Sequence, residues 1–183
     1  MAEPPKPAAA KPAVKMAATP WEAELPTQLR AEFAERIVEL STYLGQNFIV
    51  AKSDSAIDII EYLKLEFDFD FLSDLTAAHY PKDELPFEII YILYSFPRNE
   101  RLRVKIRIAE GERPPTATVV FPAANWLERE VFDMFGIEFA DHPDMRRLLL
   151  PDEWTGYPLR KDYGILNMDN RWVQENLGIE SGQ

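Results

Sequence analysis

The first half of the chain carries hydrophobic residues at intervals that predict two helices with a strand between them. The first helix is indicated by apolar residues at three- and four-residue steps, namely Leu29, Phe33, Ile37, Leu40 and Leu44. Thr27 can cap this helix, and Gly45 follows its last apolar position as a natural end. Residues 48–51 form a short apolar run, which favours a strand. A second helix is expected to begin at Ser53 or Ser55, with an apolar side made of Ile59, Leu63 and Phe67.

The middle of the chain alternates between apolar and polar residues, as strands with one buried face do. Residues 67–71 read Phe-Asp-Phe-Asp-Phe, so we expect a half-buried strand with the crossover from the second helix inside it. Residues 72–80 are expected to continue as a strand or an irregular edge, and residues 87–96 are rich in the strand formers Ile, Tyr and Phe. Residues 101–109 alternate cleanly, and residues 118–121 are a candidate for one more strand. Turn-forming prolines separate these runs, so the pattern predicts a mainly antiparallel sheet.

One face of the run 101–109 is apolar, and the other is basic. The apolar face consists of Leu102, Val104, Ile106 and Ile108, and the basic face of Arg101, Arg103, Lys105 and Arg107. A solvated face is the favoured explanation, because lysine and arginine also protect sheet edges from unwanted pairing. A docking face for an acidic partner is the alternative.

A short third helix is expected to begin near Asn125 and to end at Phe135-Gly136. Asn125 can cap it, and Glu128 stands three positions further on, as in a capping box. Its core-facing positions are Leu127, Val131 and Phe135. Arg129 and Asp133 lie away from that face and four residues apart, so they can form an ion pair along the surface, of small energetic value if it is exposed.

The two ends of the chain differ in composition from the middle. Residues 1–26 contain six prolines among alanines and lysines, so we expect a disordered tail. Residues 27–135 are expected to form an α+β domain, with a mainly antiparallel sheet packed on two helices and the short third helix. Residues 136–183 have few periodic positions and many turn formers, which predicts an irregular, extended C-terminal segment. Its arginines and the aromatic residues Trp154, Tyr157 and Trp172 are typical of interfaces, so we interpret it as an interaction segment; packing on its own domain is the alternative.

Composition limits the classes of function. The formal net charge of −11 argues against a nucleic-acid-binding protein, which needs a strongly basic surface. The chain has no cysteine, which excludes disulfides and cysteine-ligated zinc or iron–sulfur clusters within it. No apolar run reaches the length of a bilayer, and the first residues lack an apolar signal core. The cytoplasm is therefore the default location.

Residues suited to catalysis are few. His142 has several carboxylates nearby in the sequence, but no HExxH helix completes a metal site, and no fixed role is expected for His79. Phosphate-binding loops and nucleophile motifs are absent. The remaining chemistry is recognition, for which Arg146, Arg147 and Arg160 offer planar charges that bind carboxylates and would each need a partner at a subunit boundary. A metal-dependent hydrolase using His142 and a stand-alone acidic adaptor stay open as alternatives.

Two blocks of sequence resemble a known family. Residues 128–149 read EREVFDMFGIEFADHPDMRRLL, and residues 158–163 read PLRKDY. Both are similar to the signature of the C subunit of the proton-pumping NADH:quinone oxidoreductase, respiratory complex I. A weaker resemblance extends over residues 33–163.

The resemblance implies a cofactor-free subunit of the peripheral arm of that translocase, with no active site of its own. It would scaffold the quinone-site subunit (D type) and the subunit with the terminal iron–sulfur cluster (B type), on the cytoplasmic face of the bacterial cell membrane. FMN, the iron–sulfur clusters and quinone would all reside on partner subunits. Related hydrogenases and ferredoxin-linked dehydrogenases contain similar subunits. Some family members are fused to the quinone-site subunit, whereas this sequence ends at Gln183, so we expect a separate subunit.

The resemblance also assigns no catalytic, metal-binding or cofactor-binding residue to this chain. It implies instead that the two blocks and the residues between them carry the family signature and contact partners. The residues concerned are Glu128, Arg129, Glu130, Asp133, Phe135, Gly136, His142, Pro143, Asp144, Arg146, Arg147, Pro151, Trp154, Pro158, Arg160, Lys161, Asp162 and Tyr163.

Overall fold

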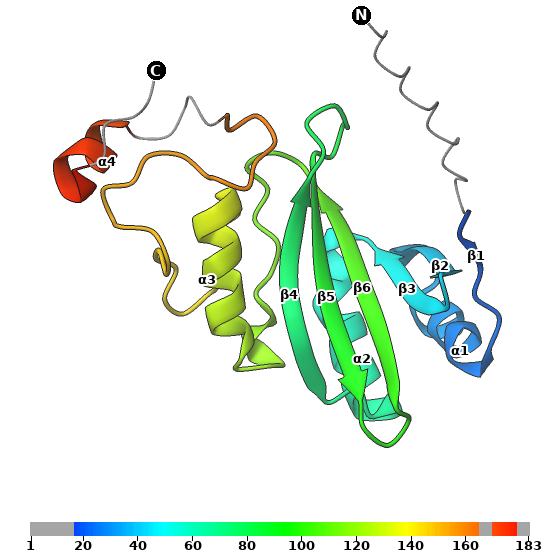
Figure 1. The fold of residues 1–183 in the computed structure, drawn as a ribbon. Coiled ribbons are helices and arrows are strands. Elements are labelled where there is room, and N and C mark those ends of the chain that lie inside the picture. Colours follow the sequence, from blue (N-terminus) through cyan, green and yellow to red (C-terminus); the bar gives the residue numbers. More distant parts are fainter. Residues whose placement is uncertain (1–16, 165–169, 179–183) are drawn as a thin grey trace, which may run out of the picture.

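A six-stranded mixed sheet lies at the centre of the computed structural model, which describes residues 17–164 and 170–178 (Figure 1). The strands are β1 (Thr19–Pro20), β2 (Ile37–Tyr43), β3 (Gln46–Ala51), β4 (Phe71–His79), β5 (Phe87–Ser95) and β6 (Glu100–Ile108). They lie in the order β1-β2-β3-β6-β5-β4, and neighbouring strands are antiparallel except for the parallel pair β3 and β6. The helices are α1 (Glu24–Phe33), α2 (Ala56–Phe67), α3 (Ala124–Phe135) and α4 (Asn170–Leu177), with 3-10 turns η1 (Ala34–Arg36), η2 (Ser53–Ser55) and η3 (Ala117–Val119). The predicted α+β fold is confirmed.

The core lies between the sheet and α2, which runs behind β5 and β6 in Figure 1. The alternation predicted for residues 101–109 is confirmed, because Leu102, Val104, Ile106 and Ile108 are all fully buried. The apolar side of α2 is buried against them through Ile59, Ile60 and Leu63. Full burial of each such side chain contributes about 1.5–3 kcal/mol, so this layer is a major source of the stability of the fold.

The prediction of one helix as far as Leu44 is wrong after Phe33. Ala34 has a φ of 43°, which ends α1, and the chain then enters β2. Leu44 and Gly45 have φ values of 51° and 73°, as a two-residue hairpin turn between β2 and β3 requires. The sequence from Ile37 to Tyr43 contains three β-branched residues, which are more favourable in a strand paired with β3 than in a helix.

The ordered part of the chain also begins before residue 27, where the sequence predicts a disordered tail. Thr19 and Pro20 pair with β2, and Trp21 is buried with 8% of its surface exposed. Helix α1 begins at Glu24, and Pro26 lies in its first turn, where a missing backbone N–H removes no helical hydrogen bond. Residues 1–16 of the predicted tail lie outside the described residues.

Three shorter predictions differ from the structure. Residues 118–121 do not form a strand, because the chain makes the 3-10 turn η3 there. The half-buried strand predicted at residues 67–71 is replaced by the end of α2, a left-handed Asp68 and a fully buried Phe69 before β4 begins. The C-terminal segment is not irregular throughout, since residues 170–177 form α4.

Candidate functional site

Helix α3 carries the start of the first signature block, and three of its four charged side chains are buried. Glu128 and Asp133 are fully buried, and Arg129 is only 7% exposed. The predicted surface ion pair between Arg129 and Asp133 is therefore wrong. The reason is the irregular chain of residues 136–164, here called the covering segment, which passes over α3 on the side away from the sheet (Figure 1). Because α3 also packs beside β4, this helix is enclosed on both sides.

Asp133 fixes the covering segment to α3. Its Oδ2 atom accepts hydrogen bonds from the backbone N–H groups of Leu148, Leu149 and Leu150, at 3.1, 2.7 and 2.8 Å. Its Oδ1 atom accepts a hydrogen bond of 2.7 Å from Nη1 of Arg147. One buried carboxylate thus orders four consecutive residues, and hydrogen bonds to a charged group of this kind are stronger than those between neutral groups.

The electrostatics of Asp133 follow from these donors. Burial acts to raise the pKa of its carboxyl group, but the N–H groups of the covering segment and Arg147 together outweigh burial and lower this pKa. The group is therefore ionised at neutral pH, and its charge holds the segment in place.

Arg147 and Arg160, which were expected to need partners on another subunit, are satisfied within the chain. Arg147 also donates to the backbone oxygen of Trp154 at 3.0 Å, and its guanidinium lies 5.5 Å from the ring centre of Tyr157. Arg160 donates to the carbonyl of Phe135 and, at 3.0 Å, to Glu110. The alternative that this part of the chain packs on its own domain is thus correct for both arginines.

Arg129 and Arg146 complete the internal network. Arg129 donates to the backbone oxygens of Arg146 and Arg147 at 3.2 and 3.1 Å, and its guanidinium lies 5.0 Å from the ring centre of Trp126. Arg146 is different, because its side chain is 70% exposed and pairs at 2.9 Å with the partly exposed Asp144. Of the predicted docking arginines, Arg146 alone therefore presents its charge to solvent.

Glu128 belongs to a second buried cluster below the covering segment. Its carboxylate accepts hydrogen bonds of 2.6 Å from the hydroxyl group of Thr116 and from the N–H of Ala117. It therefore fixes the loop before α3 and does not form the predicted capping box with Asn125, which lies inside the helix after Ala123 as N-cap. Burial raises the pKa of Glu128 to about 7, although these two hydrogen bonds act in the opposite direction.

His142 lies next to Glu128 and is held by the backbone. Its Nδ1 atom accepts a hydrogen bond from the N–H of Asp144 at 3.0 Å, and its Nε2 atom lies 3.2 Å from the carbonyl oxygen of Asn125. This geometry fits a neutral ring with the proton on Nε2. The distance from Nε2 to Glu128 is 3.8 Å, too long for a hydrogen bond. Both ring nitrogens are occupied, which gives no support to a hydrolytic site on His142.

His79 has a structural role that the sequence did not indicate. Its ring is buried on β4, stacks on Phe87 at 4.7 Å, and accepts a hydrogen bond of 3.0 Å on Nδ1 from the N–H of Lys161. Asp162 lies 3.7 Å from the same nitrogen. The second signature block is therefore tied to the sheet edge by a residue far away in the sequence, and no local pattern could have revealed it.

Close ring packing fixes the turns of the covering segment. An added Cβ at Gly136 would lie 2.5 Å from the ring of Tyr157, and one at Gly156 would lie 2.6 Å from the ring of Tyr163. The N–H of Leu159 donates to the carbonyl of Met134 at 3.1 Å, which anchors the chain just after Pro158. Pro151 accepts a hydrogen bond from the N–H of Trp154 at 3.0 Å. The segment is irregular, but it has a defined path.

Several residues around α3 remain at the surface. Trp126, Leu149 and Leu159 are 60%, 63% and 50% exposed, and Glu130 and Pro143 are exposed as well. Exposed large apolar side chains on a fixed frame are typical of protein interfaces. The structure therefore separates the predicted site residues into a buried set that shapes the segment and an exposed set that can meet another molecule.

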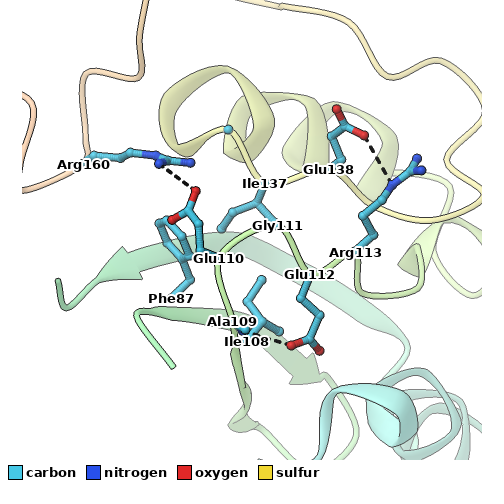
Figure 2. Close-up of a pocket in the computed structure, with 11 residues that line it drawn as sticks. Phe87, Ile108, Ala109, Glu110, Gly111, Glu112, Arg113, Ile137, Glu138 and Arg160 are labelled. Atoms are coloured by element: carbon cyan, nitrogen blue, oxygen red, sulfur yellow. Dashed lines mark hydrogen bonds and ion pairs between the residues drawn. The ribbon is translucent and has the colours of Figure 1, made fainter. Parts of the chain in front are cut away.

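A pocket of about 190 Å³ lies between the covering segment, the start of β5 and the loop that follows β6. Figure 2 shows Arg160 reaching Glu110 on one side and Arg113 reaching Glu138, at 3.3 Å, on the other. These charged groups pair with each other, so the pocket offers no free group for catalysis. Among the described residues, no group of three His, Cys, Asp or Glu side chains could hold a metal ion. None of the described helices has the length and apolar content needed to cross a membrane.

The model of the family described as "Respiratory-chain NADH dehydrogenase, 30 Kd subunit" matches residues 49–168. The chain belongs to this family. The matched range includes α3, both signature blocks and the whole covering segment, so the geometry above describes the family signature in three dimensions. The recognition of the family from the two blocks is confirmed.

Relatives and a solved structure agree with this membership. The chain is 41% identical over 140 residues to the C subunit of NADH-quinone oxidoreductase from Geobacter metallireducens, and 43% identical over 140 residues to its namesake from Trichlorobacter lovleyi. Each alignment covers 75% of this chain and 86% of the relative. A chain in the structure of the membrane-bound sulfane sulfur reductase, an archaeal respiratory membrane complex, is 26% identical with a TM-score of 0.69, over 87% of this chain and 93% of that chain.

Proposed function

We propose that this member of the 30 Kd family is a cofactor-free scaffold of NADH-quinone oxidoreductase. It would hold together the subunit that carries the terminal iron–sulfur cluster and the subunit that forms the quinone site. Electrons would pass through those subunits, with FMN, clusters and quinone bound there. The complex would sit at the cytoplasmic face of the cell membrane, with this chain peripheral.

One observation carries the proposal. The charged residues of α3 on which the frame depends, Glu128, Arg129 and Asp133, are buried. The same frame presents three large apolar side chains to solvent, Trp126, Leu149 and Leu159. An enzyme site places its charged groups where a substrate can reach them. Here Glu128, Arg129 and Asp133 are buried and bonded to backbone groups, so they fix the shape of the segment, and the exposed apolar residues would make the contact.

The test is assembly of the complex with altered contact residues. Leu149→Asp combined with Leu159→Asp places two charges on the proposed interface, where desolvating them opposes binding. We expect the tagged variant to fold but to lose the cluster-bearing and quinone-site subunits when it is purified from native membranes. Reversal of the exposed charge by Arg146→Glu should weaken the same contacts less, because the exposed pair with Asp144 contributes little.

Leu65→Asp is the matched control, because Leu65 is 69% exposed on α2 and lies outside the proposed interface. It should leave the yield of the complex unchanged. Full assembly with the double aspartate variant would refute the docking role. A stable monomer with no respiratory partners, in the unaltered protein, would favour the acidic adaptor instead. The identity of the captured subunits would also tell complex I from a related hydrogenase.

A further inference from the structure

The sheet has a second face that no described helix covers. This outer face consists of alternate residues of β6 (Arg101, Arg103, Lys105 and Arg107), of β5 (Ile90, Ile92 and Tyr94) and of β3 (Phe48 and Val50). Their neighbours in sequence, such as Val104 and Tyr91, are fully buried on the α2 side. In Figure 1, α2 lies behind these strands and the outer face is turned to the viewer. The face is separate from the surface around α3.

The basic residues of the outer face are unequally paired. Lys105 and Arg107 both contact Glu88, at 3.4 and 3.0 Å, and Arg107 also contacts Asp83 at 3.1 Å. Arg101 and Arg103 have no ion pair among the described residues. In Arg103 the Nε atom is inaccessible to solvent and has no hydrogen-bond acceptor. A buried donor of this kind is rare in native proteins and indicates a missing acceptor.

Apolar groups flank these two arginines along the face. Tyr94 and Phe96 meet at 4.9 Å, Phe96 and Phe71 meet at 5.7 Å, and Phe71 and Phe96 are 48% and 66% exposed. Toward the other end of β6, a hollow of about 370 Å³ has a mixed lining: Val38, Val50, Ala51 and Leu85 are apolar, and Lys52, Ser53, Arg107 and Glu112 are polar or charged. The guanidinium of Arg103 lies 5.9 Å from the ring centre of Phe48 but has no carboxylate partner in the described part of the chain. Exposed apolar side chains beside cations that lack carboxylate partners are typical of a contact with another protein.

We propose that the outer face binds an acidic amphipathic helix of another protein chain. The strand backbones here are already hydrogen-bonded within the sheet, so an occupant must satisfy its own backbone, as a helix does. Arg101 and Arg103 are two positions apart on a strand, a spacing of about 7 Å. Carboxylates four residues apart on a helix are about 6 Å apart along its axis, which fits both guanidinium groups. Aliphatic side chains of the helix would contact Ile92 and the hollow.

Charge selects this occupant over others. The outer face is basic, whereas the chain as a whole has a net charge of −11, which opposes binding to nucleic acid or to an anionic membrane. A helix with carboxylates on one side needs only the local pair of arginines. Membrane lipid and a second copy of this chain are therefore outcomes that the test must separate from a helix of another subunit.

The test is site-directed photo-cross-linking inside the intact complex. The photoreactive amino acid p-benzoylphenylalanine replaces Ile92 in the tagged chain, the complex is purified from native membranes and irradiated, and adducts are mapped by mass spectrometry. We expect adducts concentrated in one helical segment of another subunit, with carboxylates at three- or four-residue spacing. Arg101→Glu with Arg103→Glu should lower the adduct yield about tenfold, because charge reversal at a complementary pair opposes contact.

Two controls keep the outcome decisive. Arg30→Glu with Arg36→Glu makes the same charge change in α1 and η1 and should leave the yield unchanged. If the reversal variant does not fold, Arg101→Gln with Arg103→Gln replaces it and should still reduce the yield. Adducts with lipid, with a second copy, with a segment lacking carboxylates, or with nothing would each overturn the proposal. The chain would then still assemble through α3, so failure here is distinct from failure of the scaffold function.

Discussion

Asp133 and Glu128 are both fully buried on α3, yet their surroundings shift their protonation in opposite directions. Burial raises the pKa of each carboxyl group. At Asp133 the donors of the covering segment and Arg147 outweigh burial and lower the pKa, whereas at Glu128 burial exceeds the effect of two hydrogen bonds. The same helix therefore contains one carboxylate that stabilises the fold by staying charged and one that weakens it when it is charged.

Asp133→Asn should destabilise the protein by on the order of 3 kcal/mol, because it leaves the buried guanidinium of Arg147 without its charged partner. Chemical denaturation at neutral pH measures the change in the free energy of unfolding. Glu130→Gln, on the exposed side of the same helix, is the control and should change this free energy little. Equal effects of the two substitutions would contradict the central role of Asp133.

Glu128 predicts a dependence of stability on pH. The folded pKa of about 7 lies above the value of 4.5 expected for an exposed glutamate, so the folded state binds more protons between these values. The free energy of unfolding contributed by this residue should therefore decrease as pH rises from about 4.5 to about 7, by on the order of 3 kcal/mol in total. Below and above this window the contribution is constant.

Glu128→Gln removes the titrating group and keeps an acceptor for the N–H of Ala117. We expect the variant to unfold at a temperature that changes less with pH between 5 and 7 than that of the unaltered protein. Unfolding followed by circular dichroism at a series of pH values makes the comparison. An unchanged pH profile would show that Glu128 does not titrate in this range.

At the scale of elements, the turn from α3 into the covering segment depends on Gly136. This residue has a φ of 73°, and its Cα faces the ring of Tyr157. Gly45 has the same φ in the β2–β3 turn, but an added Cβ there would meet nothing within 4 Å. The two glycines therefore share a backbone requirement and differ in their packing.

Gly45→Ala should lower the free energy of unfolding by about 1 kcal/mol, because a residue with a Cβ is strained in the left-handed conformation. Gly136→Ala should lower the free energy of unfolding by about 2 kcal/mol more than Gly45→Ala does, because the ring of Tyr157 must move. Thermal unfolding of the two variants separates the effect of backbone strain from that of the overlap with the ring of Tyr157. Adding Tyr157→Ala to Gly136→Ala should remove part of the extra effect; no difference between the two glycine variants would show that the ring adapts freely.

Elements with one buried face were predictable from the sequence, and elements decided by distant contacts were not. The alternation of β6 and the apolar side of α2 led to correct predictions because the sheet and helix bury those faces. Ile37 and Leu40 in β2 and Leu44 in the following turn matched a helical spacing by coincidence, and pairing with β3 decided the conformation. The spacing of apolar residues along the chain does not reveal which strand will pair with it.

The family signature was recognised from residues 128–163, but the sequence misplaced its charges. Arg129 and Asp133 were expected to pair along the surface, because charged helix positions are usually solvated, and Glu128 was expected to complete a capping box with Asn125. Their acceptors and donors come from residues 116–117 and 144–150, which only folding brings together. The partner contacts of the signature stay a prediction, and the exposed Trp126 and Leu149 now define where to test them.

At the scale of the whole molecule, the chain presents two different surfaces. One surrounds α3 and consists of apolar side chains on the covering segment; the other is the basic outer face of the sheet. In Figure 1, α3 and the covering segment lie beside β4 at the edge of the sheet, whereas the outer face is turned to the viewer, so different residues form the two surfaces. Two separate surfaces are what the proposed scaffold function would require.

The dependence of the covering segment on Asp133 has a consequence for genetics. An allele such as Asp133→Asn leaves every contacting side chain in place but loosens the frame that orients them, so its respiratory defect should grow with growth temperature. The allele Leu149→Asp, by contrast, alters the contact itself and should impair respiration equally in the cold. Growth of both strains on a respiratory substrate at two temperatures would therefore distinguish a loosened covering segment from an altered contact surface.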